Sequence, residues 1–208
     1  MNNSNEVIIL AHGLLRNKYS MWVLSQYLKK HNYQTLLFGY KSRKVKYFDV
    51  AEDLKKFIDA KIKPNTKIHF VAHSMGNIVT RSFLNKYSEY NIGKFVMLGP
   101  PNQGSQVARF LSKFSIFNFL IGPNLKELSY IDLPKKLPFE VGIIAGGTKC
   151  KYGLLPILKG DNDLIVTVEE TYLDSYKDHI VLLANHSMMM YYPSVKRKAL
   201  KFLQTGCF

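Results

Sequence analysis

The sequence has 208 residues and is 47% hydrophobic, which is enough to bury one sizeable core, so a single domain over 1–208 is the simplest prediction. Lysine and arginine number 29 against 15 acidic residues, for a formal net charge of +14. Such a surface favours anionic partners. The basic clusters at 41–46 and 196–201 carry no RNA-binding or zinc-finger signature, so we expect no nucleic-acid partner. Solvated faces are the first interpretation of the charge, and peripheral contact with an anionic membrane is the second.

The cysteines and the first apolar run bear on where the protein works. Cys150 and Cys207 have no metal-ligand spacing, which predicts two free thiols in a reducing compartment. The run Val7–Ala11 is too short for a signal-peptide core or a membrane span. We therefore expect a cytoplasmic protein without a signal peptide, either free or peripherally bound to a membrane. The sequence does not predict an oligomeric state.

Taken in chain order, short apolar runs alternate with segments of helical spacing. The runs are rich in Val, Ile, Leu and Phe without polar alternation, which is typical of strands covered on both faces. They are Val7–Ala11, Thr35–Phe38, Ile68–Ala72, Phe95–Leu98, Val141–Ala145 and Ile180–Ala184. The helical segments are Met21–Leu28, 47–62, 78–87 and Pro193–Leu203. This order predicts an α/β fold with a mostly parallel sheet and helices on both faces.

The segment 105–139 departs from this alternation. It follows the fourth run, where a return helix is expected, and its first half fits that helix. The series Phe110, Phe114 and Phe117, followed by Gly122-Pro123, equally fits a lid or an apolar substrate-binding wall, because long insertions in compact domains tend to be functional. Both interpretations stay open.

The third run ends in Ala72-His73-Ser74-Met75-Gly76, directly before a helical segment. A serine on a sharp strand-to-helix turn, with small residues two positions before and after it, predicts a nucleophile elbow. The simpler alternative is a serine that caps the following helix. The sequence His12-Gly13-Leu14 follows the first run, where the Leu14 and Met75 N–H groups would together stabilise an oxyanion. His12 is expected to support that loop by hydrogen bonding.

An acid and a base are expected later in the chain. Asp161 and Asp163 both lie in a polar turn after the fifth run, and both qualify as the acid. A calcium site or a solvated turn would also use such a pair, but the calcium-loop spacing is poor. His186 follows the sixth run, at the sheet edge where Ser74 is expected, whereas His179 begins that run at the opposite edge and is expected to be structural.

Five motifs together resemble the α/β-hydrolase superfamily, in the lipase- and esterase-like branch that includes small bacterial lipases and GPI-inositol-deacylase-like proteins. They are I-I-L-A-H-G-L, A-H-S-M-G-N, G-P-P-N-Q-G-S, D-N-D-L-I-V-T-V-E-E-T and N-H-S-M-M-M. The resemblance spans Val7 to the last helix. It implies the α/β-hydrolase fold, with 105–139 as a small apolar insertion after the sixth strand of that fold.

The resemblance also implies residue roles. Ser74 matches the nucleophile, Asp163 the acid and His186 the base, while Leu14 and Met75 match the oxyanion hole. Leu164 stands where the superfamily has glycine, so we expect the backbone there to avoid a positive φ angle.

These residues predict a serine hydrolase that cleaves carboxylic, acyl or lipid esters through an acyl-enzyme, without a metal or organic cofactor. Phe110, Phe114 and Phe117 are the predicted substrate-binding residues. The alternatives are a thioesterase or peptidase that uses the same triad, and a non-catalytic protein that binds a membrane or a partner on a hydrolase fold.

Overall fold

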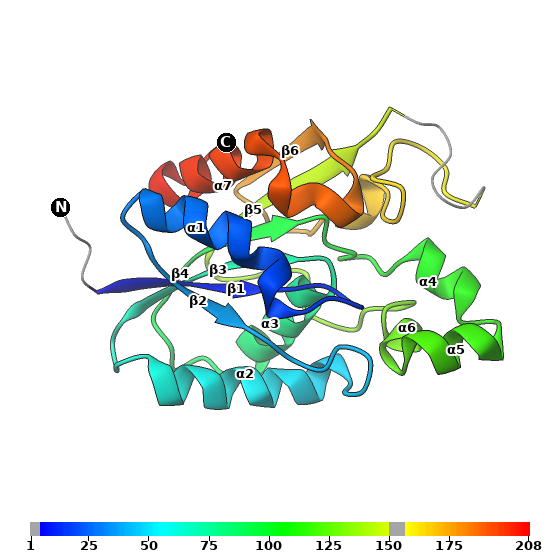
Figure 1. Cartoon of the computed structure of the whole chain (residues 1–208), viewed down its shortest axis with the longest axis horizontal. Coiled ribbons are helices and arrows are strands. Elements are labelled where there is room, and N and C mark those ends of the chain that lie inside the picture. The colour runs from blue at the N-terminus through cyan, green and yellow to red at the C-terminus, as the bar shows by residue number, and fades with distance from the viewer. Residues whose placement is uncertain (1–4, 150–156) are drawn as a thin grey trace.

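A computed structural model describes residues 5–149 and 157–208. Its centre is a parallel sheet of six strands in the order β2-β1-β3-β4-β5-β6 (Figure 1). All six predicted strands are confirmed, with ends that differ by at most a few residues. Their bounds are β1 Glu6–Ala11, β2 Gln34–Phe38, β3 Lys67–His73, β4 Ile92–Leu98, β5 Glu140–Gly147 and β6 Asp178–Leu183.

Helices cover both faces of the sheet, as the sequence predicted. In Figure 1, α1 (Trp22–Lys30) and α7 (Pro193–Thr205) lie above the sheet, and α2 (Tyr47–Lys61) and α3 (Met75–Lys86) lie below it. Side chains of β1 alternate between these two layers because successive residues of a strand point to opposite faces. Ile8 and Leu10 pack with α1 and α7, whereas Val7, Ile9 and Ala11 pack with α2 and α3. Three short 3₁₀ turns, Lys18–Met21, Glu169–Thr171 and His186–Tyr191, complete this scaffold.

The segment 105–139 forms three short helices between β4 and β5 instead of one long return helix. They are α4 (Gln106–Leu111), α5 (Ser115–Ile121) and α6 (Asn124–Glu127). Figure 1 shows them beyond the carboxyl ends of the strands. The insertion therefore lies at the carboxyl ends of the strands, where parallel α/β proteins bind their ligands.

A buried arginine attaches the end of this insertion to the scaffold. The Arg81 guanidinium, on α3, donates hydrogen bonds to the carbonyls of Leu133 (3.2 Å) and Pro134 (3.0 Å) and to Asn102 Oδ1 (3.1 Å). Burial lowers the pKa of Arg81 to about 10, so it is still charged at neutral pH. A charge in this position is stabilised by carbonyl dipoles, and they fix the chain that leaves the insertion.

The structure tests only in part the expectations about membrane spans and free cysteines. No helix within the described residues is long and apolar enough to cross a membrane. Cys207 is a free, exposed thiol, and Cys150 lies outside the described residues.

A buried histidine in β3 makes the stability of the fold depend on pH. His69 Nδ1 accepts a hydrogen bond from the Lys94 amide (2.9 Å), and burial lowers the pKa of this imidazole to about 4. The unfolded chain takes up the same proton near pH 6.5. Stability present above about pH 6.5 is therefore lost as the pH falls toward 4, by up to about 1.4 kcal/mol per pH unit. Chemical denaturation at pH 7 and pH 5 should show a smaller loss for His69→Gln than for the wild type, and equal losses would contradict this assignment.

Candidate active site

Ser74 occupies a strained turn between β3 and α3. Its φ and ψ angles are 53° and −124°, a conformation that side-chain-bearing residues rarely adopt. Gly76 permits this turn because a Cβ atom there would lie only 2.6 Å from the His12 carbonyl oxygen and 2.7 Å from that of Ala11. The small residue that the elbow motif requires is thus explained by the close approach of α3 to the end of β1.

Hydrogen bonds to β4 hold the strained serine in place. The Ser74 N–H donates to the Leu98 carbonyl (2.9 Å), and the Asn77 side-chain amide donates to the carbonyls of Ser74 (2.9 Å) and Leu98 (3.3 Å). No role for Asn77 was predicted from the sequence. Its signal is the position three residues after the serine, one helical turn into α3, where a side chain folds back onto the elbow.

The structure brings Ser74, His186 and Asp163 into one hydrogen-bonded line. His186 Nε2 lies 2.9 Å from Ser74 Oγ, and His186 Nδ1 lies 2.6 Å from Asp163 Oδ2. All three side chains are buried. Asp161 does not reach this line, because its Oδ1 accepts hydrogen bonds from the amides of Lys149 (3.1 Å) and Asn162 (2.9 Å) within its own turn. The geometry therefore favours Asp163 over Asp161 as the partner of His186.

Gly99, the first residue after β4, leaves the space in which the acid and the base meet. A Cβ atom there would lie 3.0 Å from Asp163 Oδ2 and 3.2 Å from His186 Nδ1, and its φ angle is +51°. Glycine satisfies both the space and the backbone conformation. Gly99 begins the motif G-P-P-N-Q-G-S, but no role was predicted for it from the sequence.

The loop after β1 passes directly over Ser74. A Cβ atom on Gly13 would lie 3.0 Å from Ser74 Cβ, so this loop and the elbow are in contact. Leu14 follows Gly13, and Met75 is the first residue of α3. The first N–H groups of a helix have no acceptor within the helix. The two residues predicted to form an oxyanion hole are therefore the chain neighbours of Gly13 and of Ser74, which contact each other.

The comparisons with known proteins agree with this architecture. The mature lipase BlEst2 of Bacillus licheniformis superposes with a TM-score of 0.74 at 17% identity, over 97% of this chain and 92% of that one. The esterase Pf2001 of Pyrococcus furiosus superposes with a TM-score of 0.61 at 20% identity, over 98% and 84%. The chain has the α/β-hydrolase fold. This confirms the predicted fold class.

Sequence relatives add a partial match. Residues 40–129 match the lecithin:cholesterol acyltransferase family. The lysosomal thioesterase PPT2-B of Xenopus laevis is 27% identical over 108 residues, which cover 49% of this chain and 38% of that protein. The chain thus matches well under half the length of this curated relative.

Ser74 and His186 border a cavity of about 410 Å³. Its walls are largely apolar and come from the loop after β1, the insertion and the turn that carries Asp163. The apolar lining residues are Leu14, Leu15, Pro101, Val107, Ala108, Leu111, Ile121, Leu125, Leu128, Ile165 and Val166. The cavity offers an acyl chain an apolar environment beside the serine hydroxyl.

The predicted substrate-binding phenylalanines do not line this cavity. On α4, Val107 and Leu111 share the face toward it. Phe110, Phe114 and Phe117 pack against one another instead, with ring centroids 5.5 Å and 6.1 Å apart. The insertion does line the cavity, but through its aliphatic side chains.

Two further histidines support the site in their neutral form. His12 stacks on Tyr40, its Nδ1 donates to the Gly13 carbonyl (2.9 Å), and burial lowers its pKa. His73 Nε2 donates to the backbone carbonyl of His186 (2.9 Å), and burial, followed by the nearby His186, holds the pKa of His73 well below its usual range. His12 supports the loop after β1, as the sequence predicted, and His73 helps to position His186.

The turn that carries Asp163 contradicts one expectation from the sequence. Leu164 has a φ angle of 83°, although a leucine there was expected to avoid positive φ. Side chains hold the turn: Asn162 Oδ1 accepts the Leu164 N–H (2.9 Å), and Asp163 Oδ1 accepts those of Ile165 (3.1 Å) and Val166 (2.7 Å). These hydrogen bonds hold Leu164 in a left-handed conformation that glycine adopts more readily than leucine.

Replacing Leu164 by glycine is expected to increase the free energy of unfolding by up to about 1 kcal/mol, because glycine adopts this conformation without steric cost. Leu164→Ala is the matched control: it keeps the strain, removes side-chain contacts and should not stabilise. Urea denaturation of both variants measures the difference. If Leu164→Gly were no more stable than Leu164→Ala, the strain assignment would be wrong.

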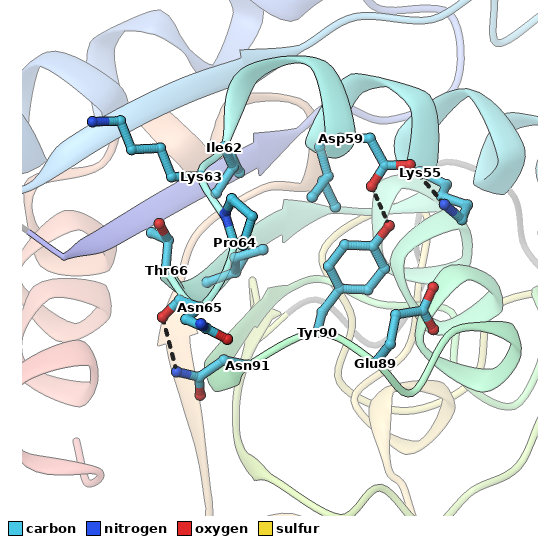
Figure 2. A pocket seen from close by; sticks show the side chains of 12 residues that line it. Lys55, Asp59, Ile62, Lys63, Pro64, Asn65, Thr66, Glu89, Tyr90 and Asn91 are labelled. Atoms are coloured by element: carbon cyan, nitrogen blue, oxygen red, sulfur yellow. Dashed lines mark hydrogen bonds and ion pairs between the residues drawn. The ribbon is translucent and has the colours of Figure 1, made fainter.

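A separate cavity of about 510 Å³ lies at the amino end of β3, next to the end of α2 (Figure 2). Two of its charged residues, Lys55 and Asp59, pair with each other. Lys55 Nζ lies 2.6 Å from Asp59 Oδ2, and the Tyr90 hydroxyl donates to Asp59 Oδ1 (2.5 Å). Since Ser74 follows the far end of β3, this cavity has no part in the chemistry of the site.

Proposed function

We propose that this chain is a serine hydrolase that cleaves carboxylic esters with an apolar acyl group. The observation that carries the proposal is the line Ser74 Oγ, His186 and Asp163, with distances of 2.9 Å and 2.6 Å, at the wall of an apolar cavity. A serine, a base within hydrogen-bond reach and an acid that orients the base are the parts that acyl transfer requires.

Acylation begins when His186 Nε2 takes the proton of Ser74 Oγ as that oxygen attacks the ester carbonyl. The resulting imidazolium keeps its Nδ1–H on Asp163, whose carboxylate stabilises the positive charge and fixes the tautomer. The carbonyl oxygen becomes an oxyanion, which the N–H groups of Leu14 and Met75 stabilise. Collapse of this intermediate transfers the proton from His186 to the departing alkoxide, which leaves as an alcohol.

Deacylation repeats these steps with water. His186 takes a proton from a water molecule that attacks the acyl-serine, the same two amides stabilise the second oxyanion, and Ser74 leaves with the proton. The acid product is released and the enzyme is restored. Every proton in this cycle is carried by the chain's own residues, so the proposed reaction uses no cofactor.

Esters of p-nitrophenol with acyl chains of increasing length test the proposal. Each methylene buried in the cavity contributes about 0.8 kcal/mol, so kcat/KM should rise about fourfold per added methylene until the cavity is filled. Failure to hydrolyse any chain length would contradict the proposal and favour the binding-protein alternative. If the acetyl ester were preferred over all longer chains, the apolar cavity would not be the site that binds the acyl chain.

A thioesterase is the second candidate, favoured by the partial match to the Xenopus thioesterase. Both reactions use the same nucleophile and base, but they differ in the leaving group. Parallel assays with an ester, a thioester and an amide of the same acyl chain separate them. We expect the ester and the thioester to react and the amide, which has the poorest leaving group, to be the slowest.

We further propose that α5 contacts an anionic lipid surface. This helix buries none of its residues, and Phe119 is 83% exposed, with Ile116 and Leu120 exposed beside it. Exposed apolar side chains on a protein of charge +14 complement a surface of acyl chains under anionic headgroups.

Phe119→Asp is expected to weaken sedimentation with phosphatidylglycerol vesicles by about tenfold or more, because it removes the burial of a phenylalanine and adds a negative charge. Tyr176→Asp, on an exposed aromatic residue before β6, is the control with the same charge change. Equal binding of the wild type to anionic and neutral vesicles at low salt would reject the membrane contact.

A further inference from the structure

A second hollow adjoins the apolar cavity and is lined by basic residues. It has a volume of about 390 Å³ and shares Leu15 and Arg16 with the cavity that contains Ser74. The segment 40–44, which follows β2, forms its other wall and contributes Lys41, Arg43 and Lys44. We call this hollow, lined by Leu15, Arg16 and 40–44, the basic groove.

The positive charge of the basic groove is not neutralised by neighbouring carboxylates. Among the described residues, none of Arg16, Lys41, Arg43 and Lys44 has an acidic group within 4.0 Å. Lys46, slightly further along, lies 2.9 Å from Glu127 and is paired. Four cations around one hollow repel one another, and an anionic ligand relieves that repulsion.

The wall of the basic groove is fixed to the wall of the apolar cavity. Asn124, fully buried on α6, donates through Nδ2 to the carbonyls of Ser42 (2.8 Å) and Val45 (2.6 Å), and its Oδ1 accepts the Tyr47 N–H (2.8 Å). Ser42 Oγ in turn accepts the Leu15 N–H (3.2 Å). The residue after Asn124 is Leu125, which lines the apolar cavity. The two hollows therefore have a constant relative position.

Arg16 connects the basic groove to the catalytic residues. Its Nη2 donates to the carbonyl of Ser187 (2.8 Å), the residue that follows His186. This contact uses one of the five N–H donors of the guanidinium, whose planar arrangement suits the oxygens of a phosphate. Arg16 is half-buried and lines both hollows.

We propose that the basic groove binds the phosphate group of an ester whose acyl chain occupies the apolar cavity. The substrate class is thus an acyl ester that carries a phosphate, either free in solution or as a phospholipid headgroup. Hydrolysis of that ester rests on the proposed function, whereas binding of the phosphate does not depend on Ser74.

Binding is tested with the Ser74→Ala protein, which leaves the ester intact. The probes are monolauroylglycerol and its phosphate, lauroyl-lysophosphatidic acid, which share the acyl chain and the ester and differ in the anionic group. Calorimetry with the monomeric probes should give at least tenfold tighter binding of the phosphate form, a difference of about 1.4 kcal/mol. Because the contacts are ionic, that difference should shrink as salt is added.

Two triple variants in the Ser74→Ala background separate the basic groove from overall charge. The first removes the charges of the groove segment: Lys41→Gln, Arg43→Gln and Lys44→Gln. The second removes three charges on α7: Lys196→Gln, Arg197→Gln and Lys198→Gln. We expect the groove variant to lose the preference for the phosphate form and the α7 variant to keep it. The proposal would be overturned if Ser74→Ala protein with an unchanged groove bound both probes with equal affinity. It would also be overturned if the two triple variants lost the preference for the phosphate form equally.

The phosphate probe presented in phosphatidylcholine vesicles distinguishes the two sources. Binding of the monomer alone supports a soluble phosphate ester, and binding in both forms supports a phospholipid. Binding in neither form rejects the groove as a phosphate site. If the probe binds but wild-type protein hydrolyses no ester, the proposed function fails while the groove assignment stands.

Discussion

Replacing Ser74 by alanine is expected to lower kcat for a p-nitrophenyl ester by at least about 10⁴-fold, because the hydroxyl that forms the acyl-enzyme is lost while the cavity is kept. His186 and Asp163 remain, but they have no nucleophile to activate. Steady-state hydrolysis measures the effect. Activity in Ser74→Ala within tenfold of the wild type would rule out the covalent mechanism through this residue.

Stability measurements separate the chemistry of Ser74 from the strain of its backbone. Alanine keeps the positive φ angle of 53°, so the melting temperature of Ser74→Ala should stay close to that of the wild type. Ser74→Gly relieves the strain and should raise the melting temperature by about 2–4 °C, the shift that corresponds to about 1 kcal/mol in a chain of this size. Both variants are expected to be inactive, so activity and stability should change independently.

Replacing Asp163 by asparagine is expected to lower kcat by about 10⁴-fold, because an amide facing His186 Nδ1 favours the wrong tautomer and supplies no negative charge. The asparagine Oδ1 can still accept the amides of Ile165 and Val166, so the turn is retained. Loss of activity with a preserved fold, checked by circular dichroism, is the expected result.

Asp161→Asn is the matched control for that substitution. Its Oδ1 accepts two backbone amides within the turn, which an asparagine oxygen can also do. We expect a change in kcat of less than about tenfold, since no contact with His186 is lost. If Asp161→Asn were the more damaging substitution, the acid would have to be reassigned to Asp161.

The sheet and the line of three side chains were predictable because both follow from local patterns. Strands covered on two faces are continuous apolar runs, so Ile68–Ala72 and Val141–Ala145 stand out in the sequence. Residues that directly follow parallel strands meet at one edge of the sheet. Ser74, which follows β3, and His186, which lies just beyond β6, were therefore expected at the same edge.

The predictions that differ from the structure concern features that depend on side-chain contacts or on segments distant in the sequence. The spacing of Phe110, Phe114 and Phe117 does not reveal which face of a short helix points inward, and the inward face proved to be that of Val107 and Leu111. The positive φ angle of Leu164 depends on hydrogen bonds from Asn162 and Asp163, which no propensity of leucine indicates.

The basic groove could not be predicted from the sequence for a related reason. Arg16 and the segment 41–44 are far apart in the sequence, and they line one hollow because β1 and β2 are neighbours in the sheet. By its sequence alone, the 41–46 cluster favours a solvated face first. Its position beside the cavity of Ser74 became evident only once the chain was folded.

The most direct test of an activated serine is labelling with a fluorophosphonate, followed by intact-mass measurement of wild-type and Ser74→Ala protein. A fluorophosphonate reacts with a serine whose hydroxyl is deprotonated by a neighbouring base. The expected result is a single adduct on the wild type and none on the variant. No adduct on folded wild-type protein, in buffer or in detergent, or an adduct that persists in Ser74→Ala, would contradict the assignment of Ser74 as the nucleophile.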